Sequence, residues 1–334
     1  MDTSYLELSL ERLGPTIRRE DLIEICINPD GRIFAEVRGD LHMHPLGVTL
    51  SPTEIRDLGT QIASVAGSTL SSRRPIVSVS IACQGRPIRA QVIQPPVTEG
   101  GFAISLRFFS SLPLSEINLS YLHGAPREEE ARRAAMAREL RAIIATGDIA
   151  ATLQLCVSEK LNMILAGGTS TGKTVTARKI LSLVPDSERI LTIEEAAELR
   201  PEQSNVVTLL ADRDNEARSA DALLTAALRL RPDRIVLGEV RGREALTFLE
   251  AINTGHGGSL TTLHAETPQL ALQRLAIAAL KTELPMSHAD MLRYIRSSID
   301  VIIQTGRHGG RRGITEIWLP GQDDAQGDTA SSPS

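Results

Sequence analysis

Aromatic side chains are scarce in this chain, which has five Phe, three Tyr and one Trp among its 334 residues. Proteins that bind single-stranded nucleic acid stack the bases on aromatic side chains, so the scarcity disfavours a module that reads RNA sequence. A basic excess is missing too, because 36 Lys and Arg are set against 41 Asp and Glu, for a formal net charge of −5. Proteins held on nucleic acid by charge carry a basic footprint, and we therefore expect no direct sequence-specific nucleic-acid binding.

Cysteines are few, and none stands in a CxxC pair: the chain has only Cys26, Cys83 and Cys156. An odd number of widely spaced cysteines argues against a disulfide framework and a structural zinc site, and it fits a reducing compartment. The sequence also lacks a signal peptide and an apolar run of the roughly 18 residues that a membrane span requires. These absences predict a soluble, cytoplasmic protein.

The rest of the composition is that of an ordinary globular protein, with 42% hydrophobic and 23% charged residues. A length of 334 residues predicts two domains. Shifts in pattern along the chain divide it into four parts: an N-terminal α+β domain over 1–110, a linker with a connector helix over 111–150, an α/β domain over 151–321, and a polar, disordered tail over 322–334.

The first hundred residues combine strand and helix signals. Apolar segments 22–27 and 32–37 flank Asn28-Pro29-Asp30-Gly31, which predicts a hairpin because Pro presets φ and Gly accepts positive φ. Ser51-Pro52-Thr53-Glu54 predicts a capping box that opens an amphipathic helix. Three further strands are predicted over 77–81, 88–93 and 102–108. The stretch 127–141 is dense in mixed charge and has one apolar face, which predicts a solvated connector helix.

From about residue 155 strands and helices alternate. Short apolar runs over 162–166, 190–193, 206–210 and 234–237 are separated by segments of helical pattern. This alternation is typical of βαβ units, in which helices cover a largely parallel sheet.

A phosphate-binding motif follows the first of these runs and precedes a predicted helix over 175–183. It matches G-x-x-x-x-G-K-S/T at every position and consists of Gly167, Gly168, Thr169, Ser170, Thr171, Gly172, Lys173 and Thr174. The glycines let backbone N–H groups point at phosphate oxygens, and the helix that starts near Val175 adds its positive dipole end. The motif predicts ATP binding, with Lys173 on the β- and γ-phosphates and Thr174 as a ligand of Mg²⁺.

Carboxylates follow two neighbouring strands of the predicted sheet. Glu194, Glu195 and Glu198 come after the run 190–193, and Glu239 comes after the run 234–237. Phosphoryl transfer requires acids at strand ends to hold the metal and to orient the attacking water. We expect Glu239 to support Mg²⁺ and one acid of the first group to polarise water. A solvated helix N-terminus is the alternative for Glu194 and Glu195.

Histidines and arginines offer further candidates. His256 and His264 lie in a Gly/Thr-rich turn and at the end of the strand that follows it, but two histidines without a third ligand do not predict zinc. Either could instead sense the nucleotide or be a satisfied core histidine. His42 and His44 lie in a Pro/Gly-rich loop and are expected on the surface. Arginines supply transition-state charge in many P-loop enzymes, and the candidates are Arg107, Arg229, Arg231, Arg234 and Arg241.

Taken together, four segments resemble the secretion ATPases, the hexameric traffic ATPases of type IV secretion and conjugal transfer, with a TrbB-like character. They are AGGTSTGKT at 166–174, TIEEAAEL at 192–199, LRLRPDRIVLGEVRG at 228–242 and NTGHGGSLTTLHA at 253–265. In the terms of that family these are the Walker A, Asp, Walker B and His boxes, in the expected order. In the N-terminal half the resemblance depends on INPDGR at 27–32 and FAISLR at 102–107.

The resemblance implies a RecA-like motor domain behind the smaller N-terminal domain, with ATP between them and six subunits in a ring. It implies that Glu198, the last acid of the Asp box, is the base, that Glu239 supports the metal, and that His264 lies near the γ-phosphate. His256 belongs to the same box, and Arg107 takes the place of an arginine that closes on the phosphates. Two positions depart from the family: Glu195 stands where Asp is usual, and Phe108 where Lys is common.

The sequence thus predicts an ATP hydrolase that powers substrate transfer or apparatus assembly in a type IV secretion or conjugal transfer system. We expect it at the inner face of the bacterial inner membrane, attached through integral membrane components and acting on a protein or nucleoprotein substrate. The alternatives are a pilus-assembly, pilus-retraction or type II secretion ATPase, a DNA-translocating P-loop motor, and a small-molecule kinase.

Overall fold

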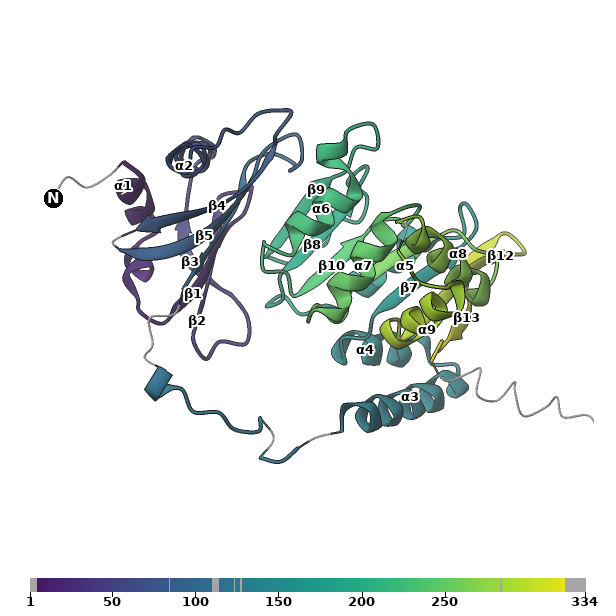
Figure 1. Cartoon of the computed structure of the whole chain (residues 1–334). Helices are drawn as coiled ribbons and strands as arrows, with labels where there is room; N and C mark the ends of the chain where they lie inside the picture. Colours follow the sequence, from purple (N-terminus) through teal and green to yellow (C-terminus); the bar gives the residue numbers. More distant parts are fainter. Residues whose placement is uncertain are drawn as a thin grey trace, which may run out of the picture.

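Two sheets, joined by a long connector, organise the chain (Figure 1). The computed structural model describes residues 5–83, 85–109, 114–122, 124–126, 128–282 and 284–321. The tail predicted over 322–334 lies outside the described residues. An antiparallel N-terminal sheet with helices precedes a parallel-rich sheet covered on both faces, which confirms the predicted fold class.

The N-terminal sheet has six strands in the order β3-β2-β1-β6-β5-β4, and its pairings are antiparallel. The strands are β1 (Leu22–Ile27), β2 (Arg32–Val37), β3 (His44–Thr49), β4 (Ile76–Cys83), β5 (Arg86–Ile93) and β6 (Ala103–Phe108). Three helical segments accompany them: α1 (Tyr5–Glu11), η1 (Pro15–Arg18) and α2 (Pro52–Val65). The capping box of α2 is confirmed, since Ser51 and Glu54 bond to each other's backbone.

The turn between β1 and β2 forms as predicted. Gly31 has φ +91°, and a Cβ placed on it would lie 2.2 Å from the Leu50 carbonyl oxygen. Only glycine fits there, because both the positive φ and the close approach of backbone exclude a side chain. The prediction missed α1 and β3, and His44 begins β3 instead of lying in a loop.

The connector leads into helices η2 (Leu114–Glu116), α3 (Glu129–Thr146) and α4 (Ile149–Ser158). The helix predicted from the charge-dense stretch is α3, and most of its surface is exposed. Its buried Leu140 belongs to the same apolar cluster as Leu153 of α4 and Leu165 of the second sheet. Arg133 also donates to Asp300 at 2.6 Å. The connector helix therefore packs as part of the C-terminal lobe. Residues 110–113, 123 and 127 of the connector lie outside the described residues.

The second sheet has seven strands in the order β13-β12-β7-β11-β10-β8-β9. They are β7 (Met163–Gly167), β8 (Ile190–Glu194), β9 (Val206–Leu210), β10 (Arg234–Leu237), β11 (Leu260–Leu263), β12 (Val301–His308) and β13 (Arg311–Trp318). All adjacent pairs are parallel except β12 and β13. The helical segments are α5 (Lys173–Leu181), η3 (Glu216–Arg218), α6 (Ala220–Ala227), α7 (Glu244–Asn253), α8 (Pro268–Leu280) and α9 (His288–Ser298).

Both faces of this sheet are covered by helices. Ile164 and Ala166 of β7 pack in the cluster that holds α6 to α9, whereas Met163 and Leu165 pack in the cluster that holds α3, α4 and α5. This alternation explains why the strands read as continuous apolar runs. In the part of the chain that the structure describes, no helix combines the length and the apolar character needed to cross a bilayer. The three cysteines are buried free thiols.

The N-terminal domain packs against the β9 edge of the second sheet. Val97 accepts a hydrogen bond from Leu210 N (2.6 Å), and Asn28 Oδ1 accepts one from the buried Arg189 (2.7 Å). His42 is half-buried at this interface, 3.6 Å from Asp233, which corrects the prediction that it is a surface residue. Strands β8, β10 and β11 stand between β9 and β7, so this edge is roughly 19 Å from β7 at strand spacings of about 4.8 Å.

Candidate nucleotide-binding site

The loop between β7 and α5 is shaped to hold an anion. A Cβ at Gly167 would lie 2.2 Å from Thr305 Oγ1 and 2.6 Å from Thr171 Oγ1, so the loop can turn here only with glycine. Gly172, with φ +101°, is the N-cap of α5, so the helix starts two residues before its predicted first residue. No described hydrogen bond engages the backbone N–H groups of residues 169–172, and donors that converge at a helix N-terminus fit phosphate oxygens.

Lys173 lies over this loop. Its Nζ donates to the carbonyl oxygens of Gly167 and Gly168, both at 2.8 Å, and it lies 3.5 Å from His264 Nδ1. Partial burial lowers the pKa of Lys173, and the charge of Glu239 opposes that shift. The ammonium thus stands beside the unengaged N–H groups of the loop, within electrostatic reach of the Glu239 carboxylate.

Glu239 and His264 reach the same edge of the sheet, because they follow the parallel strands β10 and β11. His264 Nε2 lies 3.4 Å from Glu239 Oε1, which extends the line of groups from Lys173 to His264 to Glu239. Burial raises the pKa of Glu239, and Lys173 opposes the rise. Burial, followed by the charges of Lys173 and Arg274, lowers the pKa of His264. The lowered pKa favours the neutral imidazole, in which one ring nitrogen donates a hydrogen bond and the other accepts one.

The three acids after β8 have different surroundings. Glu194 is buried, and its Oε2 accepts hydrogen bonds from the backbone N–H groups of Glu198 (2.9 Å) and Leu199 (3.0 Å). Glu195 pairs with Arg213 at the surface. Glu198 is exposed at the same edge of the sheet. Glu194 therefore braces the segment that carries Glu198 instead of facing solvent at a helix N-terminus.

This bracing gives a testable expectation for Glu194. Glu194→Ala leaves the buried Leu199 N–H and the Glu198 N–H without their acceptor, at a cost of about 1–3 kcal/mol of stability. We expect a lower kcat with little change in ATP affinity, because Glu198 loses its support and the phosphate loop does not. Glu194→Gln keeps an acceptor oxygen and should restore most of the activity. Equal kcat in Glu194→Ala and the unmodified protein, measured by phosphate release, would contradict a bracing role.

Other predicted residues fall into two groups. Arg241 pairs with Glu239 beside the site, and Thr174 lies in the first turn of α5. His256 precedes β11 and lies at the opposite end of that strand from His264, where its ring contacts the Ala251 carbonyl (3.1 Å). Arg107 pairs across strands with Glu24 and opposes the rise that burial causes in the Glu24 pKa. The structure therefore brings neither His256 nor Arg107 to the phosphate loop.

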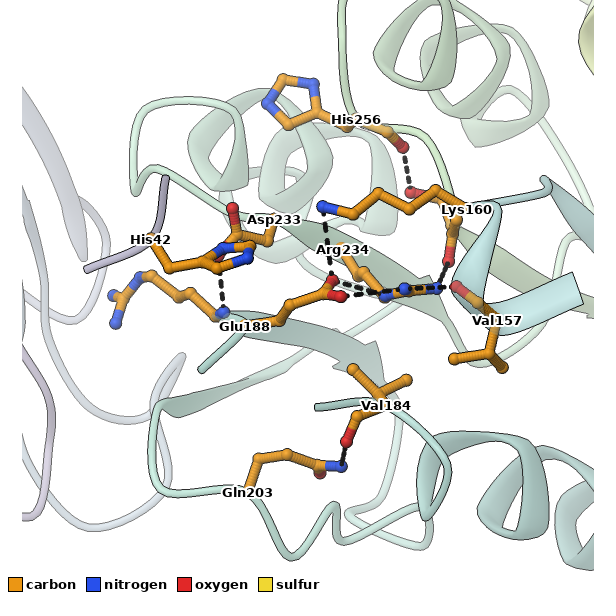
Figure 2. A network of polar contacts seen from close by, with 12 residues as sticks. His42, Val157, Lys160, Val184, Glu188, Gln203, Asp233, Arg234 and His256 are labelled. Atoms are coloured by element: carbon orange, nitrogen blue, oxygen red, sulfur yellow. Dashed lines mark hydrogen bonds and ion pairs between the residues drawn. The ribbon is translucent and has the colours of Figure 1, made fainter. Parts of the chain in front are cut away.

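Three further arginine candidates lie at the amino ends of the strands. Arg229 donates to Ser78 (2.8 Å) and Arg231 to Glu36 (2.6 Å), so both tie the two domains together. Arg234 is buried, and its guanidinium binds Glu188 (2.7 and 3.0 Å) and the Val157 carbonyl (2.8 Å), as Figure 2 shows. These residues hold the fold and do not face the nucleotide loop.

The buried pair in Figure 2 predicts a large loss of stability. Arg234→Met leaves Glu188 buried, and among the described residues Lys160 at 3.6 Å is the ion-pair partner that remains for it. Breaking a buried pair on one side costs about 3–5 kcal/mol, whereas replacing both partners with apolar groups is often neutral. We expect Arg234→Met to lower the free energy of unfolding by about 3 kcal/mol and Arg234→Met/Glu188→Leu to recover most of it. Urea unfolding followed by circular dichroism measures both; no recovery in the double variant would contradict this account.

Sequence reasoning missed three residues that the fold brings to the site. Arg213 and Arg274 come from separate segments, and both oppose the rise in the Glu239 pKa. Thr305 of β12 contacts Thr171 Oγ1 (2.8 Å) and donates to the Ala166 carbonyl (3.0 Å). No local motif marks these residues, because each is set by strand order or helix packing. Within the described ranges, no cluster of three or more His, Cys, Asp or Glu side chains is arranged to hold a metal by itself.

Comparison with known proteins agrees with this geometry. Residues 132–306 match the family model of the type II/IV secretion system protein. The chain is 32% identical over 330 residues to the type IV secretion system protein PtlH of Bordetella pertussis, covering 94% of each chain. It is 30% identical over 323 residues to VirB11 of Brucella suis, covering 92% of this chain and 88% of that protein.

A solved structure extends the similarity to the whole fold. The crystal structure of the VirB11 ATPase from the Brucella suis type IV secretion system, in complex with sulphate, superposes with a TM-score of 0.81 at 28% identity and covers 94% of both chains. The resemblance found in the sequence boxes is thereby confirmed over both domains. The chain belongs to the type II/IV secretion system protein family and is homologous to the VirB11 and PtlH proteins of type IV secretion.

Proposed function

We propose that this chain is an ATPase motor of a type IV secretion or conjugal transfer system. Homology to VirB11 supports ATP hydrolysis and a role in secretion. The observation that carries the proposal is the line from Lys173 through His264 to Glu239 beside a loop with free backbone N–H groups. This arrangement has the parts that phosphoryl transfer to water requires: a cradle, a cation and a carboxylate.

The residues present fit a bound ATP with Mg²⁺. The N–H groups of 169–172 and Lys173 bind the β- and γ-phosphates, and Thr174 with Glu239 would hold Mg²⁺, which neutralises phosphate charge when bound. Glu198 is the proposed base that takes a proton from the attacking water. Neutral His264 lies next to Lys173 and positions the γ-phosphate or the water. Arg107 belongs to the N-terminal lobe, which packs against β9 and not against the phosphate loop of its own chain. We therefore propose that Arg107 acts on the nucleotide of a neighbouring subunit.

The proposed assembly is a homohexamer that works from the cytoplasm at the inner face of the bacterial inner membrane. Inner-membrane components of the secretion channel are its proposed partners, and a protein or nucleoprotein is its proposed substrate. Nucleotide-dependent movement between the two lobes would drive substrate transfer, and the connector would act as the hinge. The interface contacts of Asn28 and Arg231 are the ones such a movement would break or remake.

Hydrolysis and assembly test this function together. The purified full chain should release phosphate from ATP to water with Mg²⁺ present, and light scattering should find a particle of about six times 36.1 kDa in the presence of nucleotide. Failure to bind Mg-ATP in calorimetry would overturn the proposal. DNA-stimulated hydrolysis with salt-dependent DNA affinity would favour a DNA motor instead, and phosphate transfer to an acceptor would favour a kinase.

A further inference from the structure

The hairpin of β12 and β13 has an uncompensated basic tip. Arg307 pairs across the strands with Arg312, and His308 pairs with Arg311, next to the Gly309-Gly310 turn. All four side chains are exposed. Like charges directly opposite each other destabilise a strand pair, and no acidic partner is recorded for these four side chains in the described ranges. The tip therefore has the character of a site for an anion.

The tip lies beside the phosphate loop. Strand β12 runs parallel to β7, with Thr305 opposite Gly167, so β12 continues past the end of β7 where the loop begins (Figure 1). The contact of Thr305 Oγ1 with Thr171 Oγ1 (2.8 Å) fixes the hairpin to the loop. A Cβ placed on Gly172 would lie 3.7 Å from Arg312 Cβ. Arg312 thus flanks the loop at its junction with α5.

Only one face of the tip is turned to the loop. Residues that pair across strands share a face, and so do residues two apart on one strand. Thr305 contacts the loop and the Arg312 Cβ is directed toward Gly172, so Arg307, which pairs with Arg312, lies on the same face. Arg311 and His308 lie on the opposite face. The hairpin therefore supplies two guanidinium groups on the loop side and a matched pair of basic residues on the other.

The sheet order sets which end of the nucleotide this face meets. Strand β7 has β11, followed by His264, on one side and β12 on the other. Under the proposed function the γ-phosphate lies toward Glu239 and His264, so the α-phosphate and nucleoside lie toward the hairpin. Guanidinium groups bind phosphate through paired N–H donors and stack on base rings. Neither the segment 163–181 nor the tip 306–313 contains a Phe, Tyr or Trp that could stack there instead, and His308 lies on the opposite face of the hairpin.

We propose that Arg312, assisted by Arg307, binds the α-phosphate and nucleoside end of the nucleotide. The inference depends on the proposed ATPase function and adds a binding role for the C-terminal hairpin. The contact is the same in the ground state and the transition state, because the α-phosphate does not react. Its loss should therefore raise KM and Kd without lowering kcat.

Calorimetric titration of the full chain with Mg-ADP and Mg-ATP tests the proposal. Arg312→Ala should weaken both ligands by about tenfold or more, Arg307→Ala should weaken them less, and kcat at saturating ATP should stay within about twofold of the unmodified protein. Arg311→Ala removes the same charge from the opposite face of the same hairpin and should leave both Kd values unchanged. Arg312→Gln, which keeps side-chain length, provides a second variant if the alanine protein unfolds.

The outcomes separate this inference from the proposed function. If the unmodified chain binds no nucleotide, the proposed function fails. If it binds and hydrolyses ATP, yet Arg312→Ala and Arg312→Gln retain its affinity, only the hairpin assignment is wrong. If Arg311→Ala and Arg312→Ala weaken nucleotide binding equally, the effect comes from net charge alone, and the hairpin assignment is also wrong. A change confined to particle size would assign the tip to contacts between copies of the chain, against the proposal.

Discussion

Lys173→Ala should abolish measurable ATP turnover, a loss of about 10³-fold or more, the upper range for removing one preorganised charge stabiliser. Lys173 Nζ lies above the loop carbonyls of Gly167 and Gly168 and next to His264, the place where the β- and γ-phosphates would lie. Removing the ammonium also takes away the largest of the charges that oppose the rise in the Glu239 pKa. Binding of Mg-ATP should weaken as well, because the role proposed for Lys173 is to contact the phosphates both before and during the reaction. Steady-state phosphate release and calorimetry measure the two effects.

Lys179→Ala is the matched control for this experiment. Lys179 lies on the same helix α5 but in its last turn, with its side chain exposed. The two variants remove the same side chain from opposite ends of one helix, so a general effect of charge or helix stability would appear in both. If turnover in Lys173→Ala lies within a factor of ten of that in Lys179→Ala, Lys173 does not have the proposed role in stabilising the phosphates.

The phosphate loop could be predicted from sequence because its geometry is local. Gly167 and Gly172 are required by contacts and backbone angles within a few residues of the motif or across one strand pair. The proximity of Glu239 and His264 could also be predicted, since parallel strands place their carboxyl ends at one edge of the sheet. Both strands were recognisable as apolar runs. The predicted turn at Gly31 and the cap of α2 formed for the same local reasons.

Residues placed by long-range packing could not be predicted. Thr305 reaches Thr171 across 134 positions of sequence, and it does so only because β12 pairs with β7. His42 is half-buried because the N-terminal lobe rests on the turn that contains Asp233. Strand β3 and helix α1 are short, and their hydrophobic residues follow no clear periodicity. Both are stabilised by tertiary contacts, which local sequence propensity does not include. Charge alone did not distinguish Arg234, which is buried with Glu188, from arginines at the site.

The position of the N-terminal lobe has a mechanical consequence. The lobe contacts β9, while the phosphate loop follows β7, which is separated from β9 by the three strands β8, β10 and β11. A nucleotide on the loop therefore acts on this lobe only through the intervening strands or through a neighbouring subunit. Strands β8 and β10 are suited to the first route. At their carboxyl ends β8 ends at Glu194 and β10 ends just before Glu239, and at their amino ends β8 follows Arg189 and β10 begins at Arg234, next to the interface.

Glu198→Gln should slow hydrolysis by about 10²-fold or more while leaving ATP binding intact, the size expected for loss of a general base. Glu198 is exposed at the carboxyl end of β8, and the buried carboxylate of Glu194 holds its backbone through the hydrogen bond at 2.9 Å. The amide cannot take a proton from water but fills the same volume. Single-turnover phosphate release with preloaded ATP isolates the chemical step from binding.

Glu239→Gln provides the contrast that identifies the base. Glu239 lies beside His264 and interacts electrostatically with Lys173. Loss of the Glu239 charge should therefore raise the Mg²⁺ concentration needed for half-maximal activity and also slow hydrolysis. Glu198→Gln should leave the Mg²⁺ requirement unchanged. Glu202→Gln, on an exposed acid of the same segment, should change neither rate nor Mg²⁺ requirement. Normal single-turnover rates in Glu198→Gln, together with a severe loss in Glu239→Gln at saturating Mg²⁺, would transfer the role of base to Glu239, because that carboxylate would then act on water and not only on the metal.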